Sequence, residues 1–333
     1  MSQAPRTAPL ATFAALIGAA LAATAAPAAA AGYQVRVLAD LGGPGTTANA
    51  INNHDDVAGS AMVASDGQQH AVAWRGGHGR PIVIDFDTAV GINDNGTVVV
   101  THHYQGEVYR RGNAPLSMPF DTYPLGIGPQ DTVYGSMDNA DAMLCTRKGG
   151  CMHVGGLPGN FISWVAGINR SNDYVGASFI DPGYEATLWR HTGQVVELPP
   201  VYTYAWAEAI NDAGVVVGRS FNDAYQTVAV RWIDGQPMVL PADSDIDTDA
   251  ESLNAFGDAV GRAWVPAANG THAMLWPMGG GAIDLDAYVG ATWKAAGWVL
   301  IEAVGINDGG RIVGRLWNAA MQQERGVILV PTP

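Results

Sequence analysis

Seven copies of a short pattern constrain the fold of this chain more than any other feature. In each copy an apolar strand ends in Ile-Asn or a close relative, a tight turn follows, and a Val-rich strand comes next. The last apolar residues before the turns, the anchors, are Ile51, Ile92, Ile127, Ile168, Ile210, Leu253 and Ile306. Their spacings are 41, 35, 41, 42, 43 and 53 residues, and a period of about 40 to 45 residues is typical of a four-stranded propeller blade.

The fifth copy predicts the strands of one unit most clearly. Its four strands are expected at residues 207–211, 215–220, 228–232 and 237–240. The first turn, Asp212 to Gly214, is favoured because Asp tolerates left-handed backbone and Gly adopts positive φ without steric cost. Third strands that end in Trp recur at Trp74, Trp189, Trp232 and Trp276.

The seventh copy ends after its third strand, at residues 327–330. Residues 34–41 resemble the fourth strand of copy four at 194–198, and they can supply the strand that is missing. We therefore predict an all-β, seven-bladed β-propeller over residues 32–333, with the last blade closed by the N-terminal strand, because closure pairs the exposed edges. An open solenoid of stacked repeats is the alternative.

Residues 1–31 have the composition of a secretory signal peptide. Arg6 supplies a positive start, residues 10–21 form a short apolar core, and Ala29 to Ala31 offer small residues for cleavage. No second apolar stretch reaches the roughly 18 residues of a membrane span. The mature protein is therefore expected to be secreted or periplasmic, without a membrane span.

The charge of the chain argues against nucleic acid as a partner. Without residues 1–31 the chain has 16 basic and 31 acidic residues, a net charge of −15. Phosphate backbones are bound by clustered Lys and Arg, but Lys148 and Lys294 are the two lysines present.

The chain has two cysteines, Cys145 and Cys151. In an exported protein such a pair is typical of a disulfide rather than of a metal or redox site. Cys145 occupies the Trp position of copy three, so Cys151 should face it across the hairpin between strands three and four.

The repeat resembles the extracellular HAF-repeat family. The pattern Ala-x-x-Ile-Asn-Asp-x-Gly-x-Val-Val-Gly lies at residues 207–218, and His-Ala-x-x-Trp lies at 70–74 and 272–276. Val72 and Met274 stand where the family has the Phe of its name. The resemblance implies a secreted repeat protein, and no catalytic residue comes with it.

Equivalent positions of the copies place aromatic and acidic side chains at one end of the predicted channel. Four residues before the anchors stand Thr47, Thr88, Tyr123, Trp164, Trp206, Asp249 and Glu302. After the second strands stand Met62, His103, Asp138, Phe179, Phe221, Trp264 and Trp317. The aromatic members of both sets are candidate ligand-binding residues, because rings and carboxylates suit the apolar faces and hydroxyls of a glycan. Packing between blades is the alternative.

A carbohydrate-active enzyme on the same face is the second hypothesis. His102, His103 and Tyr104 could transfer a proton in eliminative cleavage of an acidic polysaccharide, although adjacent His side chains in a strand point to opposite faces. A solvated loop is the alternative for these residues. Glu208, Glu251 and Glu302 are candidate carboxylates for glycoside hydrolysis.

Acidic residues alternate along the longest connection between copies, at Asp243, Asp245, Asp247, Asp249 and Glu251. Oxygen ligands at every second position resemble the first half of a calcium loop. A calcium site, with Asp243 to Asp249 as ligands, is therefore a hypothesis beside that of a solvated acidic loop.

These patterns together favour binding over catalysis. We expect a monomeric exported propeller that binds a glycan or an extracellular protein on the face of its longer loops. A purely structural envelope or matrix component is the third hypothesis.

Overall fold

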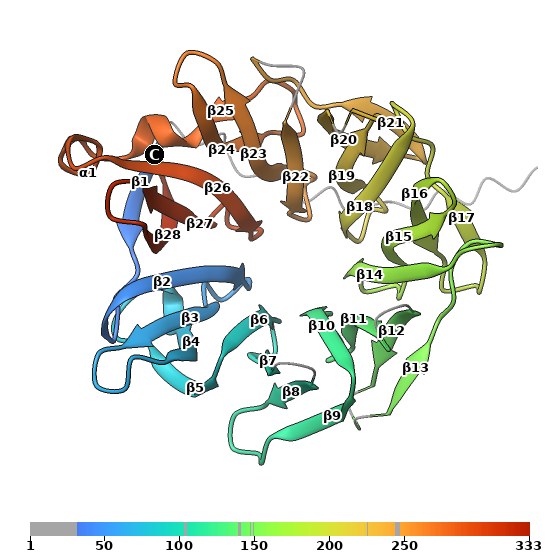
Figure 1. Ribbon diagram of the computed structural model, residues 1–333, viewed down its shortest axis with the longest axis horizontal. Coiled ribbons are helices and arrows are strands. Elements are labelled where there is room, and N and C mark those ends of the chain that lie inside the picture. The colour runs from blue at the N-terminus through green and yellow to red at the C-terminus, as the bar shows by residue number, and fades with distance from the viewer. Residues whose placement is uncertain are drawn as a thin grey trace, which may run out of the picture.

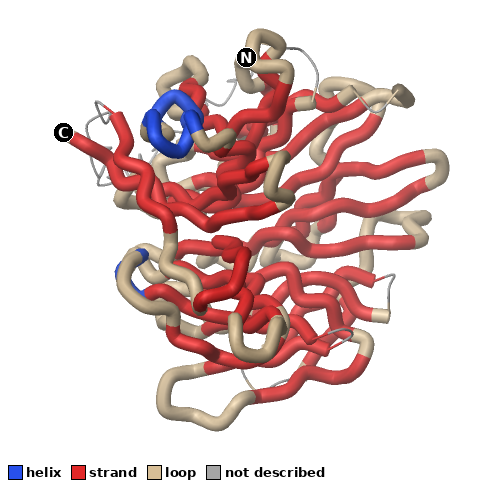
Figure 2. Tube along the Cα trace, turned by 60° about the vertical axis from the view of Figure 1, so that its left-hand side comes forward, coloured by secondary structure: helices blue, strands red, loops and turns tan. Residues whose placement is uncertain are grey.

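The computed structural model describes residues 32–333 except 103–104, 139–140, 147, 149, 225 and 244–246. In this part of the chain the strands form seven four-stranded sheets, which surround a central channel as the blades of a β-propeller (Figure 1). Short helical segments lie at the periphery (Figure 2). None of the helices described is long and apolar enough to span a bilayer. The predicted signal peptide, 1–31, lies outside the described residues.

Blades 1 to 4 occupy the first half of the propeller. Blade 1 contains β2 (Gly42–Ile51), β3 (Val57–Val63), β4 (Gln69–Trp74), the 3-10 helix η1 (Arg75–Gly77) and β5 (Ile82–Phe86). Blade 2 contains β6 (Thr88–Ile92), β7 (Val98–His102), β8 (Gln105–Tyr109) and β9 (Leu116–Phe120). Blade 3 contains β10 (Thr122–Ile127), β11 (Val133–Met137), β12 (Asp141–Cys145) and β13 (Cys151–His153). Blade 4 contains β14 (Ile162–Ile168), β15 (Tyr174–Ile180), β16 (Gly183–Trp189) and β17 (Val195–Glu197).

Blades 5 to 7 complete the ring. Blade 5 contains β18 (Tyr204–Ile210), β19 (Val216–Phe221), β20 (Thr227–Ile233) and β21 (Gln236–Val239). Blade 6 contains β22 (Thr248–Leu253), β23 (Ala259–Val265), β24 (Gly270–Trp276) and β25 (Ile283–Asp284), followed by the 3-10 helix η2 (Leu285–Tyr288) and the helix α1 (Ala291–Ala295). Blade 7 contains β26 (Trp298–Ile306), β27 (Ile312–Asn318), β28 (Gln323–Thr332) and β1 (Gly32–Val37).

The two ends of the described chain close the ring, as predicted. β1 pairs antiparallel with β28, with Gly32 opposite Thr332 and Val37 opposite Val327. The strand nearest the N-terminus is therefore the outer strand of blade 7 (Figure 1). This pairing leaves no open end for the solenoid alternative.

The strand register confirms the alignment of the seven copies. Trp206 lies opposite Arg219, Asp249 opposite Arg262 and Glu302 opposite Arg315. Residues at the same position of the sequence repeat therefore occupy the same position in the sheets of their blades. The turns between first and second strands share one end of the channel, which we call the turn end. The connections from each fourth strand to the next blade share the opposite end, the mouth.

The Asn of the Ile-Asn motif joins neighbouring blades at the turn end. Asn211 Oδ1 accepts hydrogen bonds from the backbone N–H groups of Ala213 and Val215, and Asn211 Nδ2 donates to the carbonyl of Asn254 in the next blade. Side-chain amides cross to the next blade in the same way at Asn52, Asn93, Asn169 and Asn307. The motif therefore closes its own turn and also ties one blade to the next.

The recurring Trp and Gly have packing roles. The indole N–H groups of Trp74, Trp189 and Trp232 donate to backbone carbonyls in the connection that enters their blades. A Cβ at Gly218 would overlap the carbonyl oxygen of Trp206 on the paired strand. Gly is therefore needed where the second strand approaches the bulged first strand closely.

The predicted disulfide is present between Cys145 and Cys151, which lie opposite each other on β12 and β13. We expect the double variant Cys145→Ser, Cys151→Ser to lose roughly 2 kcal/mol of unfolding free energy, because the bond closes a short loop. Urea unfolding of the oxidised protein and of the variant measures this difference. Reduction of the unmodified protein should reproduce it, and a variant as stable as the oxidised protein would contradict the expectation.

Candidate functional site

Aromatic side chains from blades 4 and 5 gather at the mouth. Trp206 makes edge-to-face contacts with Trp164, Tyr184 and Phe221, at centroid distances of 5.5, 5.2 and 5.5 Å. Phe179 packs on Tyr184 at 4.9 Å. We call these five residues the aromatic wall. Their mutual packing agrees with the inter-blade packing alternative, but all except Phe221 remain half-buried and present part of their surface.

Side chains of alternating charge form a continuous series of ion pairs along the mouth, from blade 5 to blade 7, which we call the ion-pair chain. Its members, in order, are Glu208, Arg219, Asp249, Arg262, Glu302, Arg315 and Glu324, joined by N···O distances between 2.7 and 3.6 Å. Arg219 also lies over the ring of Trp206, 4.0 Å from its centroid. This ion-pair chain therefore begins directly beside the aromatic wall.

Three glutamates share the cavity of the channel. Glu208, Glu251 and Glu302 line a cavity of about 540 Å³ together with Arg315, which we call the channel cavity. Burial, followed by the neighbouring carboxylates of Glu208, Glu302 and Asp249, raises the pKa of Glu251 to about 7. Burial also raises the pKa of Glu208. The structure thus brings together the three predicted carboxylates, and the pKa of one of them lies near neutral pH.

A further cavity of about 780 Å³ lies between blades 6 and 7. Trp317 lines it with Arg262, Glu302 and Arg315, and Lys294 lines it from the helix α1. That helix belongs to the long connection between β25 and β26, which accounts for the widest repeat spacing. We call this space the insertion cavity, and its size falls within the range of ligand pockets.

The other predicted aromatic residues are dispersed. Trp264 occupies the position in blade 6 that Trp317 occupies in blade 7, but it lines a separate cavity of about 280 Å³. Tyr123 lies on β10, opposite Ser136. Five of the aromatic positions therefore form one cluster in blades 4 and 5, whereas Tyr123, Trp264 and Trp317 lie in three other blades.

Of the residues of the lyase hypothesis, the described one, His102, does not line the channel cavity. His102 lies at the end of β7, within 3.4 Å of Asp85 and 3.5 Å of Asp87 at the junction of blades 1 and 2. His103 and Tyr104 lie outside the described residues.

Asp249, the last of the predicted calcium ligands, is buried and bonded to arginine. Its Oδ2 lies 2.7 Å from Arg262 and 3.2 Å from Arg219. Asp245 lies outside the described residues. Among the described residues, Asp85, His102 and Glu107 form a group that could hold a metal ion, and the calcium site at Asp243 to Asp249 stays a prediction.

Two sets of functional candidates were missed from the sequence. Arg219, Arg262 and Arg315 each follow the Gly of a second strand, and this repeated Gly-Arg pair was the available signal. Exposed aromatic rings also lie at the mouth, at the ends of two fourth strands, Phe86 (57%) and Phe120 (67%), and in the connections after two others, Phe161 (67%) and Tyr202 (38%). Their positions shortly before successive first strands could have been aligned like the others.

The comparisons agree with the β-propeller fold. Virginiamycin B lyase from Staphylococcus aureus, as the selenomethionine-substituted protein, matches with a TM-score of 0.56 and 14% identity over 90% of this chain and 99% of that chain. A catalytically inactive variant of that lyase with quinupristin matches with a TM-score of 0.53, 12% identity and the same coverage. Likeness at such identity concerns the fold alone. No protein-family model and no curated protein matches the chain.

Proposed function

We propose that this protein is an exported HAF-repeat propeller that binds a neutral glycan at the mouth. The observation that carries the proposal is the insertion cavity, where Trp317 faces the same space as Arg262, Glu302 and Arg315. An aromatic face stacks on the C–H groups of a sugar, and charged side chains form hydrogen bonds with its hydroxyls.

The rest of the mouth supports an extended ligand. The ion-pair chain connects the insertion cavity through Glu302, Arg262 and Asp249 to Arg219 beside the aromatic wall. Exposed aromatic rings continue along the connections of blades 1 to 5. A neutral polymer suits this surface, because the arginines are already paired with carboxylates and the chain as a whole is acidic.

Binding is tested with Trp317→Ala against Trp264→Ala. We expect Trp317→Ala to weaken binding of neutral polysaccharides by about tenfold or more, because a stacked ring contributes on the order of 1.4 kcal/mol. Trp264→Ala, which removes the same residue type from the same strand position one blade earlier, should bind as the unmodified protein does. Affinity electrophoresis or calorimetry with a panel of neutral and uronate polysaccharides measures the change. Binding of no glycan, or equal losses in both variants, would contradict the proposal.

Glycoside hydrolysis in the channel cavity is the second candidate. It is favoured by the raised pKa of Glu251, about 7, in the cavity that this residue shares with Glu208 and Glu302, since hydrolysis requires one protonated and one ionised carboxyl group. Release of reducing sugar that Glu251→Gln abolishes, while glycan binding persists, would support this candidate.

A further inference from the structure

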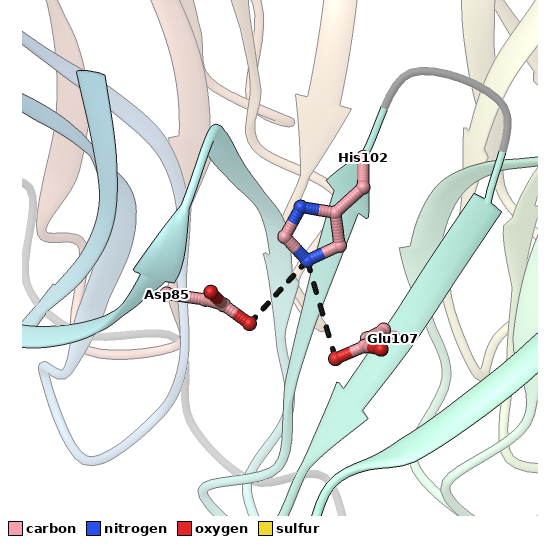
Figure 3. Close-up of side chains that lie close together, drawn as sticks. All are labelled: Asp85, His102 and Glu107. Atoms are coloured by element: carbon pink, nitrogen blue, oxygen red, sulfur yellow. Dashed lines mark ion pairs between the residues drawn. The ribbon is translucent and has the colours of Figure 1, made fainter. Parts of the chain in front are cut away.

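A cluster of three ligand atoms lies at the junction of blades 1 and 2, apart from the channel cavity. His102 Nε2 is 3.4 Å from Asp85 Oδ2 and 4.0 Å from Glu107 Oε2, and the ligand atoms of all three residues lie within 4.8 Å of one another. Figure 3 shows the imidazole pointing between the two carboxylates. Asp85 comes from β5, whereas His102 and Glu107 come from the neighbouring strands β7 and β8. The side chains are about a quarter exposed, at 29, 24 and 22%.

Blade 2 alone has ionisable residues at these two positions of its second and third strands. By register, the equivalents of His102 are Ala61, Met137, Ser178, Ser220, Ala263 and Leu316. The equivalents of Glu107 are Val72, Met143, Thr187, Val230, Met274 and Val327. Six blades are therefore built without charge here, so the fold does not require it, and partial burial of a charge is unfavourable unless a partner compensates it.

The neighbours of the cluster orient its carboxylates toward one point. Ser117 Oγ donates to Glu107 Oε1 at 2.7 Å, which leaves Oε2 directed at His102. The Tyr109 hydroxyl contacts Glu107 Oε2 at 2.6 Å and also Asp85 Oδ2. A single phenolic proton cannot satisfy both carboxylates. Two anions thus converge on one shared proton and one imidazole, an arrangement that a bound cation would stabilise.

We propose that Asp85, His102 and Glu107 bind a Zn²⁺ ion. Ligand atoms at about 2.0–2.1 Å from a tetrahedral Zn²⁺ lie about 3.4 Å apart. Nε2 is 3.4 Å from Asp85 Oδ2, and Glu107 Oε2, at 4.0 Å, would move slightly closer to bind the same ion. One imidazole with two carboxylates suits Zn²⁺ better than the hard ions Ca²⁺ and Mg²⁺, which prefer oxygen alone. Water would complete the coordination at this accessible site.

An outer carboxylate completes the arrangement. Asp87 Oδ2 lies 3.5 Å from His102 Nδ1, whereas Asp85 and Glu107 lie beside the other ring nitrogen, Nε2. Metal-bound histidines commonly donate their second N–H to a carboxylate, which fixes the orientation of the ring. Asp87 is therefore a positioning residue for His102. The ion would join the outer strand of blade 1 to the two middle strands of blade 2.

The experiment uses chelator-treated protein without a metal-binding tag, titrated with ZnCl₂ by calorimetry and melted with and without Zn²⁺. We expect about one ion per chain and a rise of several degrees in Tm, because the ion binds the folded state alone. His102→Ala and the isosteric Glu107→Gln should each weaken Zn²⁺ binding by about tenfold or more.

His153→Ala is the matched control, because His153 also lies between two aspartates, Asp138 and Asp141, which contact opposite ring nitrogens and so cannot share one ion with it. This variant should bind Zn²⁺ as the unmodified protein does. The proposal is overturned by unmodified protein that binds no more Zn²⁺ than His102→Ala, by an equal loss in His153→Ala, or by Ca²⁺ or Mg²⁺ binding as tight as Zn²⁺. A folded Glu107→Gln with unchanged affinity would remove that residue from the ligand set.

Discussion

Asn211→Ala is expected to lower the unfolding free energy by about 3 kcal/mol, since buried polar groups left without partners cost about 1–3 kcal/mol each. The substitution removes the acceptor for the backbone N–H groups of Ala213 and Val215 and the donor to the Asn254 carbonyl. Asn211 itself is buried. Equilibrium unfolding in urea, followed by tryptophan fluorescence, measures the change.

Asn222→Ala separates the turn contribution from the inter-blade contribution. Asn222 accepts the same two backbone hydrogen bonds, from Ala224 and Gln226, in an exposed loop of the same blade. Its side-chain amide donates within the loop rather than to the next blade. We expect a loss below about 1 kcal/mol here, because water replaces the lost partners. Equal losses in the two variants would mean that the connection between blades adds nothing to stability.

The repeat predicted the architecture because each blade carries its own turn and strand signals in consecutive residues. The anchors set the register, and the register placed Trp164, Trp206 and Glu302 at one end of the channel. Ring closure was also predictable, because residues 34–41 carry the strand pattern that the seventh copy lacks.

The chemistry of the sites was harder to predict from the sequence, because it depends on distances between residues of different blades. The identity of Glu251 shows a carboxyl group, but its pKa reflects burial and charges from strands far apart in sequence. In the same way, Asp85 precedes the repeat that contains His102 and Glu107, and only the packing of blade 1 on blade 2 brings them together. The insertion cavity depends on a connection that has no equivalent in the other copies.

Glu251→Gln is expected to stabilise the propeller at pH 8 by up to about 3 kcal/mol, with almost no effect at pH 4.5. The native pKa of Glu251 is about 7 and its ordinary value is 4.5. Between these values the native state holds more protons than the unfolded state, so the stability from this group is complete below about pH 4.5 and is lost as the pH rises through 7. The amide of Gln cannot ionise and loses nothing.

Urea unfolding of both proteins from pH 4.5 to 8 measures the difference. A constant difference between the Glu251 variant and the unmodified protein across this range would contradict the raised pKa. The expected gain in the amide variant would mean that the Glu251 carboxyl group lowers the stability of the native state at neutral pH. A carboxyl group of this kind is typical of a site with a chemical role. The pH profile of stability and the hydrolysis assay therefore test Glu251 by two independent measurements.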